Sequence, residues 1–216
     1  RLRAAPSLTI APSAMWWLRG ADDQLNANTG RVLLAHGPGL PNAATELDAI
    51  VGVVGRPALS LVGGDATVAR VMSEAAAADL MHIAAHGSFR ADNPMFSSLQ
   101  LADGLLYVYD LQRLKHTPRA VILTACSAGA SGVYSGDELL GTSIALLSLG
   151  VHSVIAPLLA VPDEATAAFA VAIHQAMQRG AGPDVALAMA GAAAVASGDP
   201  SAIAVAAAFQ MIGIKI

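Results

Sequence analysis

Cys126 is the only cysteine among 216 residues, and it closely follows an apolar run, Ala120–Thr124, that is typical of a buried strand. Forty residues earlier, a second such run, Leu80–Ala84, leads into His86-Gly87. A thiolate is a strong nucleophile, and a nearby imidazole raises its population at neutral pH. A lone cysteine is often only a packing residue, so Cys126 alone identifies no site. The matching strand that ends in His-Gly predicts cysteine–histidine hydrolase chemistry.

The elements that must position this pair are two parallel strands. In an open parallel sheet, reactive groups collect at the carboxyl ends of the strands. If the strands before His86 and Cys126 are neighbours, about 4.8 Å apart, the two side chains can meet at that edge. The backbone N–H groups of Gly87 and Cys126 are then candidates for an oxyanion hole.

Two other histidines compete with His86 for the role. His36-Gly37 also follows an apolar run, and the chemistry of the residues does not separate His36 from His86. His82 lies inside its predicted strand, so we expect it to be a packed, hydrogen-bonded histidine. The remaining histidines show no metal-ligand spacing.

An acidic pair, Asp137 and Glu138, opens the predicted helix after the cysteine loop. Ser135 and Glu138 fit a capping box, and acidic residues in a first turn are favoured by the helix dipole. The alternative is that Asp137 or Glu138 faces the substrate and selects a basic side chain. Both interpretations stay open at this point.

The composition of the chain limits which fold classes and which binding partners can be expected. The chain is 55% hydrophobic and 13% charged, with a formal net charge of −4. Its length favours a single domain, and its charge argues against direct nucleic-acid binding. One cysteine allows no internal disulfide, so we expect a reducing, cytoplasmic compartment. The alanine-rich, lysine-poor composition suggests a bacterial source.

No motif calls for a cofactor. The chain has no P-loop, no Gly-x-Gly-x-x-Gly fingerprint and no Gly-x-Ser-x-Gly elbow. We therefore expect neither a cofactor nor a metal.

The stretch from Leu139 to Pro162 contains no charged residue and is long enough to raise the question of a membrane span. Gly150 divides it, and several hydroxyl side chains are spread through it. We interpret it as a buried helix followed by a buried strand, and we expect no membrane association.

The predicted fold is an α/β sandwich, with about six mostly parallel strands and helices on both faces, because short apolar runs alternate with helical patterns. The predicted strands are Val32–Ala35, Ala58–Val62, Leu80–Ala84, Ala120–Thr124, His152–Pro157 and Val205–Ile212. The predicted helices are Ala43–Val54, Thr67–Ala78 with Asp65 as its N-cap, Glu138–Leu149, Glu164–Arg179 and Pro183–Ser197. Between the His and Cys strands, Asp103-Gly104 is a strong turn signal and predicts a small hairpin over the site.

A spaced set of motifs resembles the CHAT domain, a caspase-like cysteine peptidase module of the same clan as caspases, separases and gingipains. The segments that carry the resemblance are His82–Gly87, Asn93–Ser97, Leu123–Cys126, Gly136–Leu139 and Val161–Asp163. The resemblance implies a caspase-type fold over residues 1–216, with His86 and Cys126 as the catalytic dyad. It also implies a protein or peptide substrate and association with TPR repeats or another sensor region. The family's usual start lies upstream of Arg1, so an N-terminal portion is expected to be missing.

The chain departs from the family pattern at two places. Ser127-Ala128 stand where many members have Glu-Thr after the cysteine, and Leu159 replaces a common tryptophan. These changes bear on substrate preference and on activity. The main interpretation is therefore a cysteine endopeptidase, and the alternative is an inactive caspase-like scaffold for protein–protein interaction. A different thiol hydrolase, such as an amidase, fits the dyad but not the wider motif set.

Overall fold

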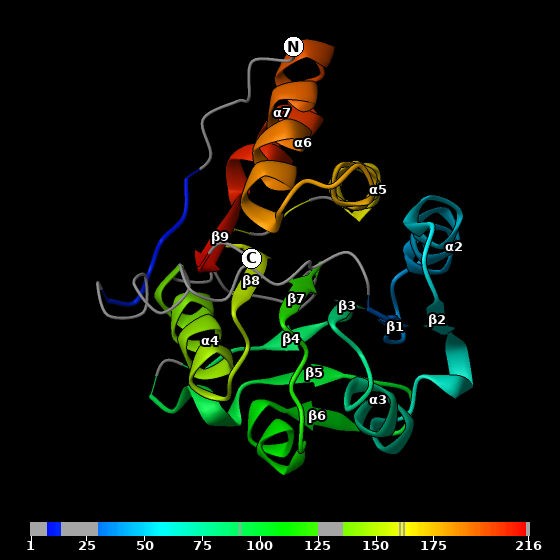
Figure 1. Cartoon of the computed structure of the whole chain (residues 1–216), viewed down its shortest axis with the longest axis vertical. Helices are drawn as coiled ribbons and strands as arrows, with labels where there is room; N and C mark the ends of the chain where they lie inside the picture. The colour runs from blue at the N-terminus through cyan, green and yellow to red at the C-terminus, as the bar shows by residue number, and fades with distance from the viewer. Residues whose placement is uncertain are drawn as a thin grey trace.

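A six-stranded sheet forms the centre of the protein (Figure 1). The computed structural model describes residues 8–13, 30–90, 92–124, 136–159, 161 and 163–214, except for the side chains of 136–139 and 163. The strand order is β2-β1-β3-β7-β8-β9. The strands are β1 (Val32–His36), β2 (Ala58–Leu61), β3 (Leu80–Ala84), β7 (Ala120–Leu123), β8 (Ser153–Pro157) and β9 (Phe209–Gly213). The apolar side chains of the four central strands are buried on both faces, as a sheet covered on both sides requires, and those of edge strand β2 are partly buried.

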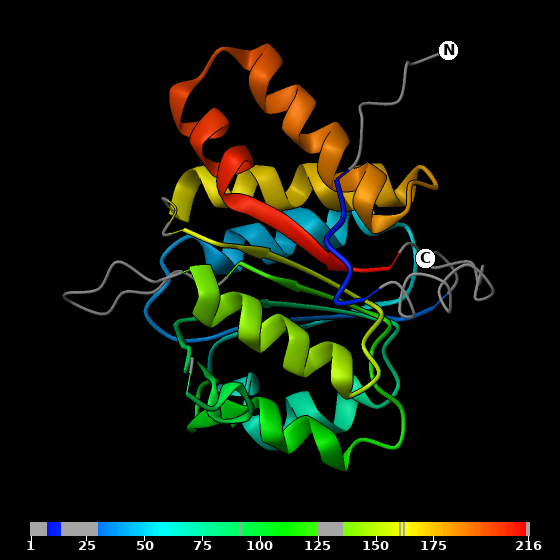
Figure 2. The same ribbon diagram turned by 90° about the vertical axis from the view of Figure 1, so that its left-hand side faces the viewer.

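Helices cover both faces of this sheet (Figure 2). One face carries α2 (Ala43–Val54), α5 (Asp163–Gln178), α6 (Pro183–Ser197) and α7 (Pro200–Ala208). The opposite face carries α3 (Val68–Ala75), α4 (Gly136–Ser148) and a small second sheet. Alternate residues of each strand enter these two separate cores. The layered α/β architecture predicted from the apolar runs is confirmed.

The small sheet has the order β4-β5-β6 and includes the predicted hairpin. Its strands are β4 (Gly87–Ser88), β5 (Ser98–Gln100) and β6 (Leu105–Tyr107), all antiparallel. The backbone N–H of Gln100 donates to the carbonyl oxygen of His86 at 2.8 Å. Short 3₁₀ turns flank the hairpin, η2 (Pro94–Phe96) and η3 (Val108–Arg113). The hairpin is therefore attached directly to the end of the His strand.

Two expectations need correction. The run Val205–Ile212 is not one strand, because its first four residues belong to α7 and only β9 is extended. β9 also pairs antiparallel with β8, whereas the other pairs in this sheet are parallel. Asp65 does not cap α3. The cap is Thr67, whose side-chain oxygen accepts from the N–H of Arg70 at 3.2 Å.

The outer edge of β9 is covered by the segment 8–13. Ile10 forms an isolated parallel bridge with Ile212. Its N–H donates to Met211 at 3.1 Å, and its carbonyl accepts from Gly213 at 2.8 Å. The segment thereby satisfies backbone groups that an edge strand would otherwise expose.

Among the described helices, none is long and apolar enough to cross a membrane. The uncharged stretch divides as predicted into α4 and β8, separated by a turn at Gly150 with φ of 101°.

Gly37 shows how closely the two sheets approach each other. A Cβ atom at this position would overlap the carbonyl oxygen of Gln100, which is backbone and has little freedom to move away. Gly37→Ala should therefore lower the free energy of unfolding by about 1–3 kcal/mol, the usual cost of overpacking. Urea denaturation measures the change.

Gly52→Ala is the matched control, because Gly52 is exposed in α2 and a Cβ atom there meets nothing within 4 Å. This variant should gain about 0.5–1 kcal/mol from helix propensity. Equal stabilisation by both variants would show that the small sheet moves aside at no cost.

Candidate active site

The His strand and the Cys strand are neighbours in the centre of the sheet. β3 and β7 are parallel, with Leu80 opposite Ala120 and Ile83 opposite Leu123. His86 comes three residues after Ile83, and Cys126 comes three residues after Leu123 in the sequence. Cys126 itself lies outside the described residues. The sequence analysis assumed that these two strands are neighbours, and the structure shows that they are.

His86 is half-buried just beyond β3, beside the loop that joins β1 to α2. Its ring packs against Gly39, where an added Cβ atom would lie 3.1 Å from Nε2. Gly39 also has a φ of 81°, a backbone conformation that side chains rarely adopt. Both facts tie the position of the His86 ring to a glycine at position 39.

His36 ends β1, which borders β3 on the side opposite to β7. It is half-buried, and its Nδ1 lies 2.7 Å from the carbonyl oxygen of Gly37. Two strand spacings of about 4.8 Å each separate β1 from β7. The His36-Gly37 pattern has a structural explanation of its own, since Gly37 leaves space for Gln100.

Gly87 belongs to β4 and lies opposite Leu99 in β5. His86 and Gln100 form the preceding pair of this ladder. That pair is hydrogen-bonded, because the N–H of Gln100 donates to the carbonyl oxygen of His86. Antiparallel ladders alternate hydrogen-bonded and non-hydrogen-bonded pairs, so the N–H of Gly87 is not used by β5 and points away from it. This orientation suits a donor to a bound carbonyl oxygen.

A buried polar cluster lies below the strand ends, on the face covered by α2 and α5. Oε1 of Glu46 in α2 lies 3.0 Å from Nε2 of His82 in β3 and accepts from the hydroxyl of Thr124 at 3.1 Å. Oγ1 of Thr124 is also 3.2 Å from Nε2 of His82. Nδ1 of His82 lies 3.1 Å from Nε2 of His174 in α5. All four side chains are at most 3% exposed.

His174 stays neutral inside this cluster. Burial lowers the pKa of its imidazole well below the ordinary value of 6.5, and the nearby charges of His82 and Arg56 lower it further. His82 is thus the packed, hydrogen-bonded histidine that the sequence predicted. Within the described ranges, no three or more His, Cys, Asp or Glu residues are grouped so that they could hold a metal ion.

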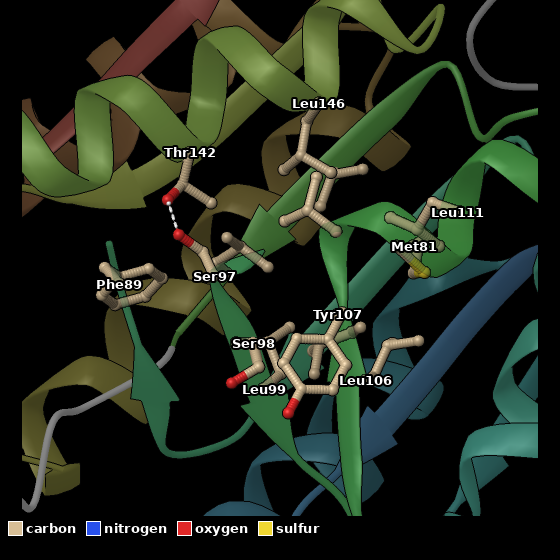
Figure 3. Close-up of a pocket in the computed structure, with 14 residues that line it drawn as sticks. Met81, Phe89, Ser97, Ser98, Leu99, Leu106, Tyr107, Leu111, Thr142 and Leu146 are labelled. Atoms are coloured by element: carbon tan, nitrogen blue, oxygen red, sulfur yellow. Dashed lines mark hydrogen bonds between the residues drawn. The ribbon is translucent and has the colours of Figure 1, made fainter. Parts of the chain in front are cut away.

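The opposite face of the same strands is apolar. Figure 3 shows an apolar pocket between β3, β7, the small sheet and α4, lined among others by Ile83, Leu99, Leu123 and Leu146. None of its lining residues is charged, and the hydroxyl of Thr142 donates to Ser97 at its rim at 2.8 Å. This pocket is lined mainly by apolar side chains and contains neither a histidine nor a cysteine, unlike the strand ends.

The acidic pair Asp137 and Glu138 lies in the first turn of α4, although the positions of these two side chains are outside the described set. Ser135, the predicted partner in a capping box, also lies outside it. The following turn of α4 is fixed firmly to the hairpin side. Gly141 packs so closely on Pro94 that an added Cβ atom would lie 3.0 Å from its ring.

Sequence reasoning missed Glu46, Thr124 and His174 as members of one cluster. A signal was present, because Glu46 occupies the buried stripe of α2 together with Ala43, Leu47 and Ile50. A carboxylate on the apolar face of an amphipathic helix needs a buried partner. Nothing in the local sequence shows which residues supply it.

Comparison with solved structures identifies the fold. Gingipain R, an Arg-specific cysteine proteinase, superposes with a TM-score of 0.63 and 12% identity, over 87% of this chain and 47% of that one. The complex of the pro- and mature domains of RgpB from Porphyromonas gingivalis gives a TM-score of 0.63 and 10% identity, over 87% and 48%. Separase in its Saccharomyces cerevisiae complex with securin gives 0.65 and 14%, over 99% of this chain and 14% of that one.

These TM-scores show a fold shared with caspase-like cysteine proteases, and the chain spans half or less of each of these structures. No curated protein matches the chain by sequence. The sequence does match the CHAT domain family over residues 8–213, which is nearly its whole length. The chain therefore belongs to the CHAT domain family.

Proposed function

We propose that this chain is a cysteine endopeptidase of the caspase-like type, with His86 and Cys126 as its dyad. The observation that carries the proposal is the pairing of β3 with β7. Ile83 lies opposite Leu123, and the two reactive residues follow at equal distances along neighbouring parallel strands. This register supports the proposal, because residues that follow paired positions of neighbouring parallel strands emerge at the same edge of the sheet.

The proposed reaction starts with the Cys126 thiolate, which attacks the carbonyl carbon of the scissile peptide bond. The backbone N–H groups of Gly87 and Cys126 stabilise the oxyanion of the tetrahedral intermediate. His86 gives a proton to the leaving amine, so that the C–N bond breaks and a thioester remains. Water then attacks the thioester and transfers a proton to His86, and the C–S bond breaks to release the peptide acid and the Cys126 thiolate.

The proposed substrate is a protein or peptide, recognised at the strand ends and by the first turn of α4. The fold shared with gingipain R and separase supports this substrate class. Gingipain R is Arg-specific, which agrees with a role for Asp137 or Glu138 in selecting a basic side chain. An attached or associated TPR region, or another sensor, is the proposed regulator.

The rival function is an inactive interaction scaffold. Ser127-Ala128 and Leu159 depart from the common family pattern, and they are the observations that favour it. The scaffold hypothesis requires Cys126 to be unreactive toward peptide electrophiles, whereas the peptidase hypothesis requires reaction.

The dyad makes a comparative prediction. Cys126→Ala should abolish labelling by acyloxymethyl-ketone peptides while the protein remains folded. His86→Ala should lower the rate of peptide hydrolysis by about 10²–10⁴-fold, the usual contribution of a general acid–base residue. His36→Ala should change the rate little, because β1 is not adjacent to β7.

Circular dichroism spectra of all three variants serve as the folding control. Peptide hydrolysis by Cys126→Ala at the wild-type rate would disprove the assignment of the nucleophile. A larger loss of hydrolysis rate in His36→Ala than in His86→Ala would show that His36, at the end of β1, is the catalytic histidine.

The acidic pair makes a prediction about specificity. If Asp137 or Glu138 binds a basic side chain, wild-type protein should prefer Arg or Lys before the scissile bond. Removal of one partner from a buried charge pair costs about 3–5 kcal/mol, so Asp137→Ala or Glu138→Gln should remove that preference. A peptide-library profile of the three proteins measures it.

The helix-cap interpretation predicts a different pattern. Glu138→Gln would then change the free energy of unfolding by about 1 kcal/mol or less and leave the profile unchanged. A wild-type profile without basic preference would leave the acidic pair as a helix cap only.

A further inference from the structure

The buried cluster of Glu46, His82, Thr124 and His174 connects both dyad strands to two of the covering helices, α2 and α5. Glu46 belongs to α2, His82 to β3 and His174 to α5, and Thr124 follows the last residue of β7. One carboxylate oxygen, Oε1 of Glu46, contacts groups from both strands at 3.0 and 3.1 Å. The proposed reaction uses none of these four side chains.

Two members of the cluster lie just before the dyad residues in the sequence. His82 precedes His86 by four residues, and Thr124 precedes Cys126 by two. His82 lies opposite Ile122, so its ring reaches diagonally along the sheet to Thr124. The His86 ring packs on Gly39 in the loop that leads into α2, the helix that supplies Glu46.

The hydrogen bonds form a consistent set. Thr124 donates its hydroxyl proton to Oε1 of Glu46, and the same oxygen lies 3.0 Å from Nε2 of His82. Nδ1 of His82 lies 3.1 Å from Nε2 of His174, so each of the four side chains has a polar partner. A network in which each member has a partner is rigid, because loss of one member leaves buried polar groups unsatisfied.

We propose that Glu46, His82, Thr124 and His174 are positioning residues, which hold the carboxyl ends of β3 and β7 at the spacing that the His86–Cys126 pair requires. This inference rests on the proposed dyad. None of the four residues is assigned to touch the substrate or the reacting atoms. The shared oxygen of Glu46 fixes the two strand ends relative to each other, and His174 fixes the His82 ring from the other side.

The test uses Thr124, because its side chain can be changed with little change in shape. Thr124→Val removes the hydroxyl group, whereas Thr124→Ser keeps it. Cys126 is the only cysteine, so the rate of its alkylation by iodoacetamide reports one site in the whole protein. The same variants are assayed for kcat and KM with the best peptide substrate.

We expect Thr124→Val to lower kcat and the alkylation rate at pH 7 by on the order of tenfold to a hundredfold, since small misplacements of reacting groups have such effects. The pH profile of alkylation should shift upward, because a thiol farther from the imidazole is less acidic. KM should change little. Thr124→Ser should restore most of both rates.

Ile50→Val is the matched control. Ile50 is fully buried on the same face of α2, one turn from Glu46, and it has no polar group. Its replacement should leave kcat and alkylation unchanged. If Thr124→Val does not fold, Glu46→Gln takes its place, with the same expected loss, because an amide replaces the carboxyl group whose Oε1 contacts both Thr124 and His82.

Wild-type rates in folded Thr124→Val and Glu46→Gln would overturn the positioning role. Equal losses in Ile50→Val would overturn it as well, because the effect would then reflect general loosening of the core. His86→Ala separates the inference from the function on which it rests. If His86→Ala leaves alkylation unchanged while Thr124→Val lowers it, the dyad fails and the positioning of Cys126 stands.

Discussion

The parallel pairing of β3 with β7 is the constraint on which the rest of the site depends. Both strands have neighbours on each side and are buried on both faces. A slip of one residue would exchange the side chains that enter the two cores, so the register is strongly fixed. Parallel strands end at the same edge, and their register determines which residues emerge there together. The packing of the hydrophobic core, which fixes this register, therefore also determines the geometry of the site.

The two faces of β3 and β7 have different surroundings. Toward α3, α4 and the small sheet, the contacts are mostly apolar, and no charged residue lines the pocket there. Toward α2 and α5, the protein buries a carboxylate and two imidazoles close to the strand ends. Burial of such groups is costly unless each is hydrogen-bonded. Here the partners come from four separate segments, so the contacts form only when the whole layer is assembled.

The sequence predicted the core strands well, because the central strands are apolar on both faces. Leu80–Ala84 has the predicted bounds, and Ala43–Val54 and Pro183–Ser197 are helices with the predicted bounds. It failed at Val205–Ile212, where an alanine-rich helix passes directly into an apolar strand and the continuous apolar run does not show the boundary. The adjacency of the His and Cys strands was supposed from chemistry, and the sheet order supports it. The assignment of His86 and Cys126 to catalysis stays a prediction.

The buried cluster could not be predicted, because its members are far apart in the chain. Glu46 and Thr124 are separated by 78 residues, and His82 and His174 by 92. Periodicity shows that Glu46 lies on a core face but says nothing about which helix or strand lies across from it. Such long-range contacts follow from the strand order and the helix layers, which local sequence patterns do not specify.

The two edges of the main sheet are protected in different ways, and this difference affects how the protein behaves when it is damaged. β2 has only four residues, which offers little backbone for pairing with another molecule. β9 has five residues, and the Ile10 segment covers its outer edge with backbone hydrogen bonds. Proteolytic trimming of that segment would expose an apolar edge strand with unpaired amides. Such an edge is a template for aggregation, so a few residues remote from the dyad protect the solubility of the whole domain.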